Sequence, residues 1–420
     1  MGSRYYGVIG NRDHIKIKGE KRPFWEFLDK QPDGYLTSLV YMREDLPKYM
    51  HMIFDCGAWS YRNDEVPKIT PESALDGYLS LAKPGDFLIA PDHMLIQGAD
   101  VEARRKFNLS SAEKFLKICP SDFVPMATSH GMDLAERVEH GKQLASMGYR
   151  HIAIGGVAAR ASQKSLVLSM MLEIRKALPG VWLHVLGLSS PPYTAAWNEY
   201  GIESFDGSSH FKQAFTGGAF FIIEDGKLKK HQAARPGEEI TAPQCWCNAC
   251  ETLGVEGVDT RRYGSNEHNM GRAAHNMNML MRAQSYAVTG ETVLISCVGQ
   301  KTAHPAPAKD LYRSDWFIKA RKYAENKGAR WAILSAEHGL LMPDQVVDPY
   351  EKTLNTMCIA DREVWAEKTV RQIKKRFRKA LYLFWPGQNT GSFWRCHLSM
   401  LGTMLRCHCS AWVLGNNWRG

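Results

Sequence analysis

The sequence predicts an α/β protein that begins with a (β/α)8 barrel, the TIM-barrel fold, and ends with a smaller α/β domain. Apolar strand-like runs alternate with helical patterns and start about thirty residues apart, which is typical of parallel strands joined by helices. Six or more such units within roughly 200 residues favour a closed barrel over an open doubly wound sheet. The runs lie at 52–55, 87–90, 123–127, 151–154, 182–188 and 203–206, with helical patterns at 101–118, 132–147 and 162–177 between them.

Polar residues stand where these runs end, and this is the third observation behind the barrel. The carboxyl ends of barrel strands build the active site in proteins of this fold. One aspartate after a strand commonly caps the next helix, but several carboxylates meeting at one face point to a site. The residues concerned are Asp55, Asp92, His130, Gly155, Gly156 and Asp206.

The composition is typical of a folded protein, and the mild basic excess permits a polyanionic partner without requiring one. The chain has 420 residues, of which 44% are hydrophobic, and its 53 basic and 44 acidic residues leave a net charge of +9. Apolar runs stay far below the ~18 residues of a membrane span, and residues 1–6 lack the apolar core of a signal peptide. We expect a cytoplasmic protein without membrane contact, in the host cytoplasm if a phage encodes it.

The pattern changes after residue 218. Residues 218–228 are typical of a hairpin with Asp225-Gly226 at its turn, and Thr289-Gly290 marks a domain boundary. Beyond it, strands are predicted at 292–296, 331–335 and 381–385, with helices at 314–327 and 361–378. We therefore expect three parts: a barrel at 1–240, a metal-binding segment at 241–288 and an α/β domain at 291–420.

Cys245, Cys247 and Cys250 form the most specific local motif, because three thiolates within six residues suit a tetrahedral Zn²⁺. His268 and His275 are both candidates for the fourth ligand, and the helical pattern around residues 273–283 favours His275. A closed Cys₃His site is structural rather than catalytic. A second group, Cys396-His397 with Cys407-His408-Cys409, is better explained as a buried C-terminus than as a metal site.

Several motifs occur in a fixed order: Phe54-Asp55-Cys-Gly-Ala-Trp-Ser, Ile154-Gly155-Gly156-Val, Val185-Leu-Gly187-Leu, Ser204-Phe205-Asp206-Gly-Ser, the three cysteines and His275-Asn276. Over residues 1–288 this order resembles the tRNA-guanine transglycosylases. It is most similar to their DNA-directed DpdA-type relatives, which insert 7-deazaguanines into phage or bacterial DNA. The resemblance implies an irregular (β/α)8 barrel with a zinc subdomain.

The resemblance also implies roles for individual residues. Asp206 matches the nucleophile that forms a covalent glycosyl intermediate, and Asp55 matches the general acid/base. Asp92 corresponds to the aspartate that reads the guanine edge, and Gly155 and Gly156 to the glycine pair whose backbone holds the base. The implied partners are double-stranded DNA, a 7-deazaguanine base such as preQ0 and a second copy of the chain.

The motifs depart from the family at two places. His130 stands within Ser129-His130-Gly131, where the family has Gln-Gly-Gly, and Trp59 stands within Gly57-Ala58-Trp59-Ser60, where it has Gly-Gly-Phe-Gln. We expect both residues to contact the base or its neighbours, with a core or rim aromatic as the alternative for Trp59. Because we recognise no RNA-binding domain of the kind that some archaeal members of the family carry, we expect DNA rather than tRNA as the substrate. The alternatives are a tRNA substrate and a non-catalytic zinc protein that binds nucleic acid.

The last part of the chain offers two further features. Residues 371–379 hold six cations, among them Lys374, Lys375, Arg376 and Arg378, and form either a phosphate-binding face or a solvated helix surface. Polar residues also follow two predicted strands, at Ser296-Cys297 with Lys301 and at Ser335–Gly339. We expect the second group to cap and pack, with a small site as the alternative.

Overall fold

The computed structural model describes residues 2–11, 13–47, 50–224, 226–290, 292–297, 299–326, 330–377, 381–386, 393–401 and 404–407. At Asn326, Asn355, Lys374 and from residue 381 onward it describes the backbone. The chain divides into two units, one built around a barrel and one around a six-stranded sheet. Each unit is described by itself.

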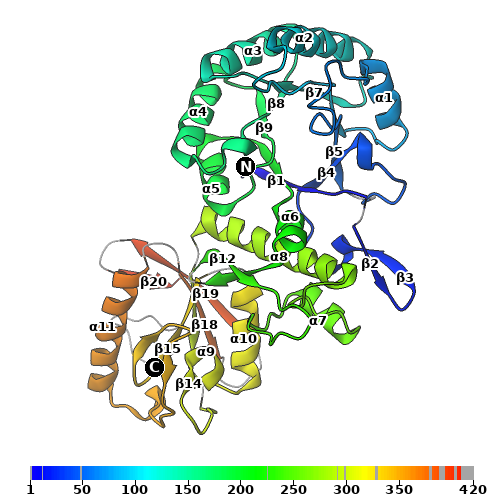
Figure 1. Cartoon of the computed structure of the whole chain (residues 1–420). Helices are drawn as coiled ribbons and strands as arrows, with labels where there is room; N and C mark the ends of the chain where they lie inside the picture. Colours follow the sequence, from blue (N-terminus) through cyan, green and yellow to red (C-terminus); the bar gives the residue numbers. More distant parts are fainter. Residues whose placement is uncertain are drawn as a thin grey trace. The chain divides into compact units, whose positions relative to one another are not determined.

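Eight strands, each parallel to its neighbours, close into a barrel, which confirms the predicted fold class (Figure 1). The order around the barrel follows the chain from β4 to β10, and β1 closes it between β10 and β4. The strands are β1 (Arg4–Val8), β4 (Gly34–Ser38), β5 (His51–Asp55), β6 (Phe87–Ile89), β7 (Val124–Ser129), β8 (His151–Ile154), β9 (Trp182–Val185) and β10 (Ser204–Gly207).

The barrel is irregular in its first quarter. A hairpin of β2 (His14–Ile17) and β3 (Glu20–Pro23) and a short helix η1 (Phe24–Phe27) stand between β1 and β4. Between β4 and β5, the described residues form one short helix, η2 (Leu39–Tyr41). From β5 onward each strand is followed by an α-helix: α1 (Pro71–Leu79), α2 (Val101–Ile118), α3 (Leu134–Met147), α4 (Lys164–Ala177), α5 (Pro191–Tyr200) and α6 (Ser209–Thr216).

Local sequence signals fix the ends of these helices. Thr70 forms a capping box with Ser73 ahead of Pro71, and the Asp100 and Asp133 carboxylates accept the backbone N–H of the third helical residue of α2 and α3. Gly148 ends α3 in the left-handed region, at φ 118°, which only glycine adopts without strain.

Alternate residues of the strands fill the barrel. Tyr6, Leu36, Ile53, Met126 and Ala153 form one buried cluster with neighbours on β6. Because successive strand residues point to opposite faces, the residues between them face the surrounding helices. The barrel interior is therefore a packed core, and room for a ligand lies only at its ends.

Two strands of the barrel are missing from the predictions. β1 and β4, with the sequences RYYGV and GYLTS, mix glycine and polar residues with aromatics, so neither resembles the apolar runs of the other strands. The strand at His151–Ile154 and the helix at Val101–Ile118 occur where they were predicted.

A hairpin and two helices follow the barrel in the chain. They are β11 (Ala219–Glu224), β12 (Lys227–Gln232), α7 (Asn248–Val255) and α8 (Asn266–Thr289). The hairpin confirms the prediction for residues 218–228, although Asp225 of the predicted turn lies outside the described residues.

The second unit has a mixed sheet in the order β16-β15-β13-β18-β19-β20. Its centre is β13 (Thr292–Ser296), which runs parallel to β15 (Arg330–Ser335) and β18 (Leu381–Pro386). The outer strands β16 (Gly339–Leu341), β19 (Phe393–Leu401) and β20 (Met404–Cys407) are antiparallel. The helices are α9 (Ala308–Leu311), α10 (Asp315–Asn326) and α11 (Ile359–Arg376), and β14 (Ala306–Pro307) pairs with β17 (Val346–Val347).

Among the described residues, no helix combines the length and the hydropathy that crossing a bilayer requires.

Packing inside the barrel predicts a large cost for shortening a core side chain. Met126 is fully buried in the barrel cluster, so Met126→Ala should lower the free energy of unfolding by about 2–5 kcal/mol. Met132, which is 37% exposed, supplies the control, and Met132→Ala should change it by less than about 0.5 kcal/mol. Urea denaturation of both variants checks this, and equal effects would contradict the packing.

Candidate active site

Three aspartates stand at the carboxyl ends of barrel strands. Asp55 is the last residue of β5, Asp92 follows β6, and Asp206 lies within β10. Asp92 and Asp206 are almost completely buried. Because all eight strands are parallel, the same end of the barrel collects these side chains.

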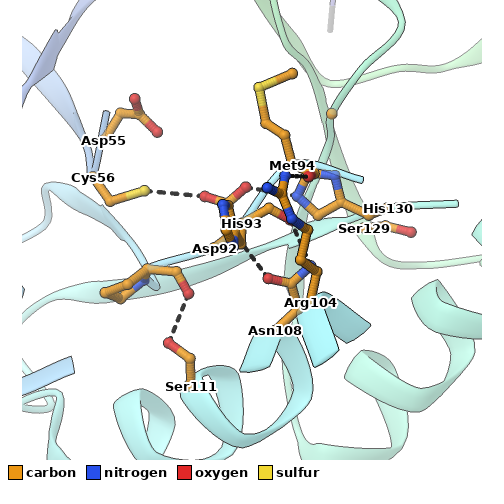
Figure 2. Close-up of polar contacts among 12 residues, drawn as sticks. Asp55, Cys56, Asp92, His93, Met94, Arg104, Asn108, Ser111, Ser129 and His130 are labelled. Atoms are coloured by element: carbon orange, nitrogen blue, oxygen red, sulfur yellow. Dashed lines mark hydrogen bonds and ion pairs between the residues drawn. The ribbon is translucent and has the colours of Figure 1, made fainter. Parts of the chain in front are cut away.

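The Asp92 carboxylate is held from both sides, as Figure 2 shows. The Cys56 thiol donates to Oδ1 over 3.0 Å, and His130 Nε2 lies 2.6 Å from Oδ2. Burial raises the pKa of Cys56 well above its usual value, with a further rise from the Asp92 and Asp55 charges, so the group is a neutral thiol that can donate. The Tyr61 hydroxyl donates to the Asp92 carbonyl over 3.0 Å, which fixes the backbone as well.

Helix α2 anchors the loop that carries Asp92. The Asn108 side chain bonds both backbone groups of His93, at 2.6 and 3.0 Å, and Ser111 donates to the Pro91 carbonyl over 2.6 Å (Figure 2). The buried Arg104 guanidinium donates to the Met94 carbonyl over 2.6 Å. These bonds satisfy loop backbone that would otherwise be buried without partners, so the position of Asp92 depends on α2.

His130 orients Asp92 and is itself oriented by a second histidine. The His130 backbone N–H donates to His140 Nδ1 over 3.0 Å, which requires a neutral His140 ring. Burial lowers the pKa of His140 to about 4, consistent with that state. The predicted substrate residue His130 therefore lies in the site, with its ring nitrogen on Asp92.

The surroundings of Asp55 shift the pKa of its carboxyl group strongly. The Gly57 N–H donates to Oδ2 over 3.0 Å. Burial raises its pKa to about 7, and the charges of Asp92 and Asp206 add to the rise. One oxygen of Asp55, the Cys56 sulfur and one oxygen of Asp92 all lie within 4.8 Å of one another. A carboxyl group that titrates near neutrality can both give and take a proton.

Asp206 is held through one oxygen. The Gly187 N–H donates to Oδ1 over 2.8 Å, and His184 Nε2 lies 3.3 Å from the same atom. His184 is fully buried on β9, and its other nitrogen lies 2.9 Å from the Ser204 hydroxyl. Both hydrogen bonds of the carboxylate thus converge on Oδ1.

Gly155 and Gly156 follow β8 beside His130. The Gly155 N–H donates to the Ser129 carbonyl over 3.2 Å, and the Gly155 carbonyl accepts from buried Arg137. A Cβ at Gly155 would stand 2.7 Å from the Thr128 methyl group and 3.0 Å from the His130 ring, so only glycine fits. Gly156 is exposed with φ 73°. The barrel itself thus uses both backbone groups of Gly155.

Trp59 lies in the loop after β5 and is 65% exposed. The Arg62 guanidinium stands 4.3 Å from its ring centroid and donates to its carbonyl over 2.6 Å. This exposure excludes Trp59 from the core. The side chain is therefore either a rim residue or a surface on which a base can stack.

The three cysteines and His275 form a group that fits a metal. Their donor atoms lie within 4.8 Å of one another, and His268 is not in the group. Cys250 Sγ lies 3.3 Å from His275 Nδ1. This is close to the separation of about 3.6 Å expected between two ligands of a tetrahedral zinc. The buried His275 ring stacks on Phe220 with centroids 3.8 Å apart, which fixes its plane. Three thiols and one imidazole are a donor set typical of structural zinc.

The predicted basic surface is described in part. Lys375 and Arg376 are exposed at the end of α11. The Lys374 side chain and Arg378 lie outside the described residues, as do the side chains of the cysteine and histidine group at 396–409.

Sequence reasoning missed three residues that fix the site: Cys56 and His184 contact the Asp92 and Asp206 carboxylates, and Arg137 donates to the Gly155 carbonyl. Cys56 lies within a quoted motif and Arg137 within the helical pattern at 132–147, but neither was assigned a role. His184 did leave a signal, because a histidine in the middle of the apolar run at 182–188 is unusual.

The fold and the site define the class: a (β/α)8 barrel that collects buried carboxylates at the end where active sites of this fold lie. The chain is similar to a DNA-guanine transglycosylase of Salmonella montevideo, with 27% identity over 184 residues. The match covers 40% of this chain and 43% of the relative, so it spans less than half of either protein. Residues 292–389 match a family of unknown function, DUF6884.

The cysteine and histidine group predicts a structural metal. The purified chain should contain one zinc ion, and Cys247→Ser should lose it and melt at a lower temperature, because structural zinc contributes directly to folding. Cys119→Ser removes a thiol outside the group and should keep the metal. Elemental analysis with thermal melting tests this, and zinc retained in Cys247→Ser would refute the ligand set.

The raised pKa of Asp55 predicts a pH dependence of stability. Between pH 4 and 7 the folded chain holds a proton at Asp55 that the unfolded chain releases, so this contribution to stability is lost as the pH rises through that window. Its size is at most roughly 4 kcal/mol. Urea denaturation at pH 5 and 8 should show Asp55→Asn gaining stability relative to the wild type at the higher pH. The exposed Asp76→Asn control should follow the wild type, and parallel pH profiles for all three proteins would disprove the shift.

Proposed function

We propose that this protein exchanges guanine in DNA for a 7-deazaguanine base, by a covalent intermediate on Asp206. The observation that carries the proposal is the convergence of Asp55, Asp92 and Asp206 at one end of the barrel. The similarity to a DNA-guanine transglycosylase supports both the reaction class and the substrate.

Asp206 is the proposed nucleophile. Its Oδ1 is anchored by Gly187 and His184, so the carboxylate is fixed before the substrate arrives. One carboxylate oxygen forms a bond to C1′ of the deoxyribose while the bond from C1′ to guanine breaks, and the bonding pair leaves with the base. The incoming base then attacks C1′ and releases Asp206, as in a two-step retaining displacement.

Asp55 is the proposed general acid and base. In the first step it gives its proton to the departing guanine, and in the second it takes a proton from the incoming base, so the exchange is balanced without a cofactor. A pKa of about 7 lets one group serve in both directions at neutral pH.

Asp92 is the proposed reader of the base, with Gly156 and His130 beside it. A guanine-like base offers N1–H and N2–H₂ as donors, and a fixed carboxylate can accept both. Adenine lacks this pair and would leave a buried charge without its partners, which disfavours adenine strongly. The two bonds from Cys56 and His130 set the direction in which Asp92 faces.

A guanine within a duplex must leave the stack to reach a barrel end, at a cost of a few kcal/mol. Exposed Trp59 is suited to stack on a neighbouring base, and the basic end of α11 to contact phosphates. We assign catalysis to residues 1–240, structural zinc to 241–288 and DNA recognition to 291–420, and we propose a homodimer.

The nucleophile assignment predicts the loss of exchange in one variant. Asp206→Asn keeps the shape of the side chain but not the charge, so incorporation of labelled guanine into duplex DNA should fall by roughly a thousandfold or more. Asp76→Asn on the surface of α1 should retain full activity. Exchange preserved in Asp206→Asn would remove this residue from the reaction.

Substrate choice is tested by offering duplex DNA and tRNA in parallel. The proposal predicts label in DNA, and label in tRNA alone would replace it with a tRNA-guanine transglycosylase. Binding without exchange on either substrate would indicate a non-catalytic zinc protein. Mass spectrometry of nucleosides from cells that express the chain identifies the inserted base.

A further inference from the structure

The second unit carries a polar cluster that the proposed function does not use. Cys297 follows β13, and Ser335 ends β15. The two strands are parallel and pair from Thr292 with Arg330 to Ser296 with Leu334, so their carboxyl ends are adjacent. Tyr312, Tyr350 and Lys301 complete the group, which we name the β13–β15 cluster.

The cluster lies where an open sheet binds ligands. Helix α10 packs on the face with Val293 and Ile333, whereas α11 packs on the face with Leu294 and Leu334. The chain leaves β13 through α10 to β15 and returns through α11 to β18, on the other side of β13. This reversal at β13 is a topological switch point, and ligands of such sheets bind at the carboxyl ends of the strands there.

The hydroxyl groups of the cluster form a chain of hydrogen bonds that leaves one hydroxyl proton without an acceptor in the chain. Ser335 Oγ accepts the N–H groups of Glu337 and His338 over 3.2 and 3.0 Å and donates to the Tyr350 hydroxyl over 2.8 Å. The Tyr350 and Tyr312 hydroxyls share one hydrogen bond of 2.7 Å. The two tyrosines have two phenolic protons, and the hydrogen bond between them uses one. The other phenolic O–H is therefore left to donate to an acceptor outside this chain of hydroxyls.

Lys301 places a positive charge beside these phenols. Its Nζ lies 4.3 Å from the Tyr350 ring centroid and 6.0 Å from that of Tyr312. A backbone bridge between Lys301 and Tyr312 holds the two segments together. Within the described residues, the one hydrogen bond of the ammonium is a long one, 3.4 Å to the Gly299 carbonyl, although the group has three protons to donate.

The acid of the loop after β15, Glu337, pairs with another lysine. The Glu337 carboxylate pairs with Lys352 at 3.5 Å. In addition, the hydroxyl of Ser296, directly before Cys297, is buried without a hydrogen-bond partner among the described residues. The cluster thus presents an ammonium group and a phenolic proton, and it lacks a matching acceptor within the part of the chain that is described.

We propose that the β13–β15 cluster binds a phosphate group, with Lys301 and the phenol pair as its donors. A phosphate oxygen accepts from both donors and supplies the acceptor that the hydroxyl chain lacks. Free phosphoesters and the backbone of a nucleic acid present the same chemistry. The inference rests on the second unit alone and is independent of the proposed exchange reaction.

Titration calorimetry on the full chain tests the proposal, with inorganic pyrophosphate and a duplex oligonucleotide as probes. Lys301→Gln should weaken binding of at least one probe by roughly tenfold or more, because a charged hydrogen bond is lost. Tyr350→Phe keeps the ring, breaks the hydroxyl chain and should weaken binding several-fold. Lys319→Gln removes the same charge from an exposed position on α10 and should bind as the wild type does.

The two probes separate the sources of the phosphate. Saturable pyrophosphate binding that depends on Lys301 supports a free phosphoester, and duplex binding alone that depends on Lys301 supports a nucleic-acid backbone. Equal affinities of Lys301→Gln and Lys319→Gln for both probes, or no binding of either, would overturn the proposal. If Lys301→Gln does not fold, as judged by its melting curve, Tyr350→Phe decides: weaker binding supports the proposal, and unchanged affinity overturns it.

Discussion

Mutual repulsion among three carboxyl groups at one end of a barrel is the constraint on which the site depends. Each charge is buried or partly buried, so each must be satisfied by donors or neutralised. Asp92 receives the Cys56 thiol and His130, and Asp206 receives Gly187 and His184. Asp55 accepts the Gly57 N–H, and burial together with the charges of the other two aspartates raises its pKa. Asp55 is therefore the carboxyl group that holds a proton near neutral pH. The proposed roles of Asp92 as base reader, Asp206 as nucleophile and Asp55 as proton carrier thus rest on the different partners of the three groups.

The closed barrel makes this arrangement possible, and the surrounding helices refine it. Parallel strands bring together residues that lie more than a hundred positions apart in the chain, such as Asp55 and Asp206. Helix α2 then fixes the loop of Asp92 through Asn108 and Ser111, and Arg137 of α3 clamps the turn at Gly155. The geometry of the site therefore rests on buried polar contacts of the helices, and their loss would move the carboxylates without removing them.

The sequence predicted the alternation of strands and helices because apolar runs such as residues 151–154 are buried from both sides and carry few polar residues. The sequence did not predict β1 or β4. Their glycine and tyrosine residues interrupt the apolar pattern by which the other strands were recognised. The three aspartates and the cysteine group stood out through their positions after strands and their spacing. Cys56 and Arg137 did not, since a hydrogen-bond donor becomes recognisable only when folding brings it to its acceptor, and His184 differed from its surroundings only as a histidine within an apolar run.

The central claim is a transient bond between Asp206 and a sugar carbon. Peptide mass mapping tests it most directly: the protein is denatured during turnover on a guanine-containing duplex, digested with protease and nuclease, and searched for a deoxyribose attached to a side chain. The account predicts the attachment on the peptide with Asp206 and its absence after Asp206→Asn. An attachment on Asp55 or Asp92, or turnover with no attachment to Asp206, would contradict it.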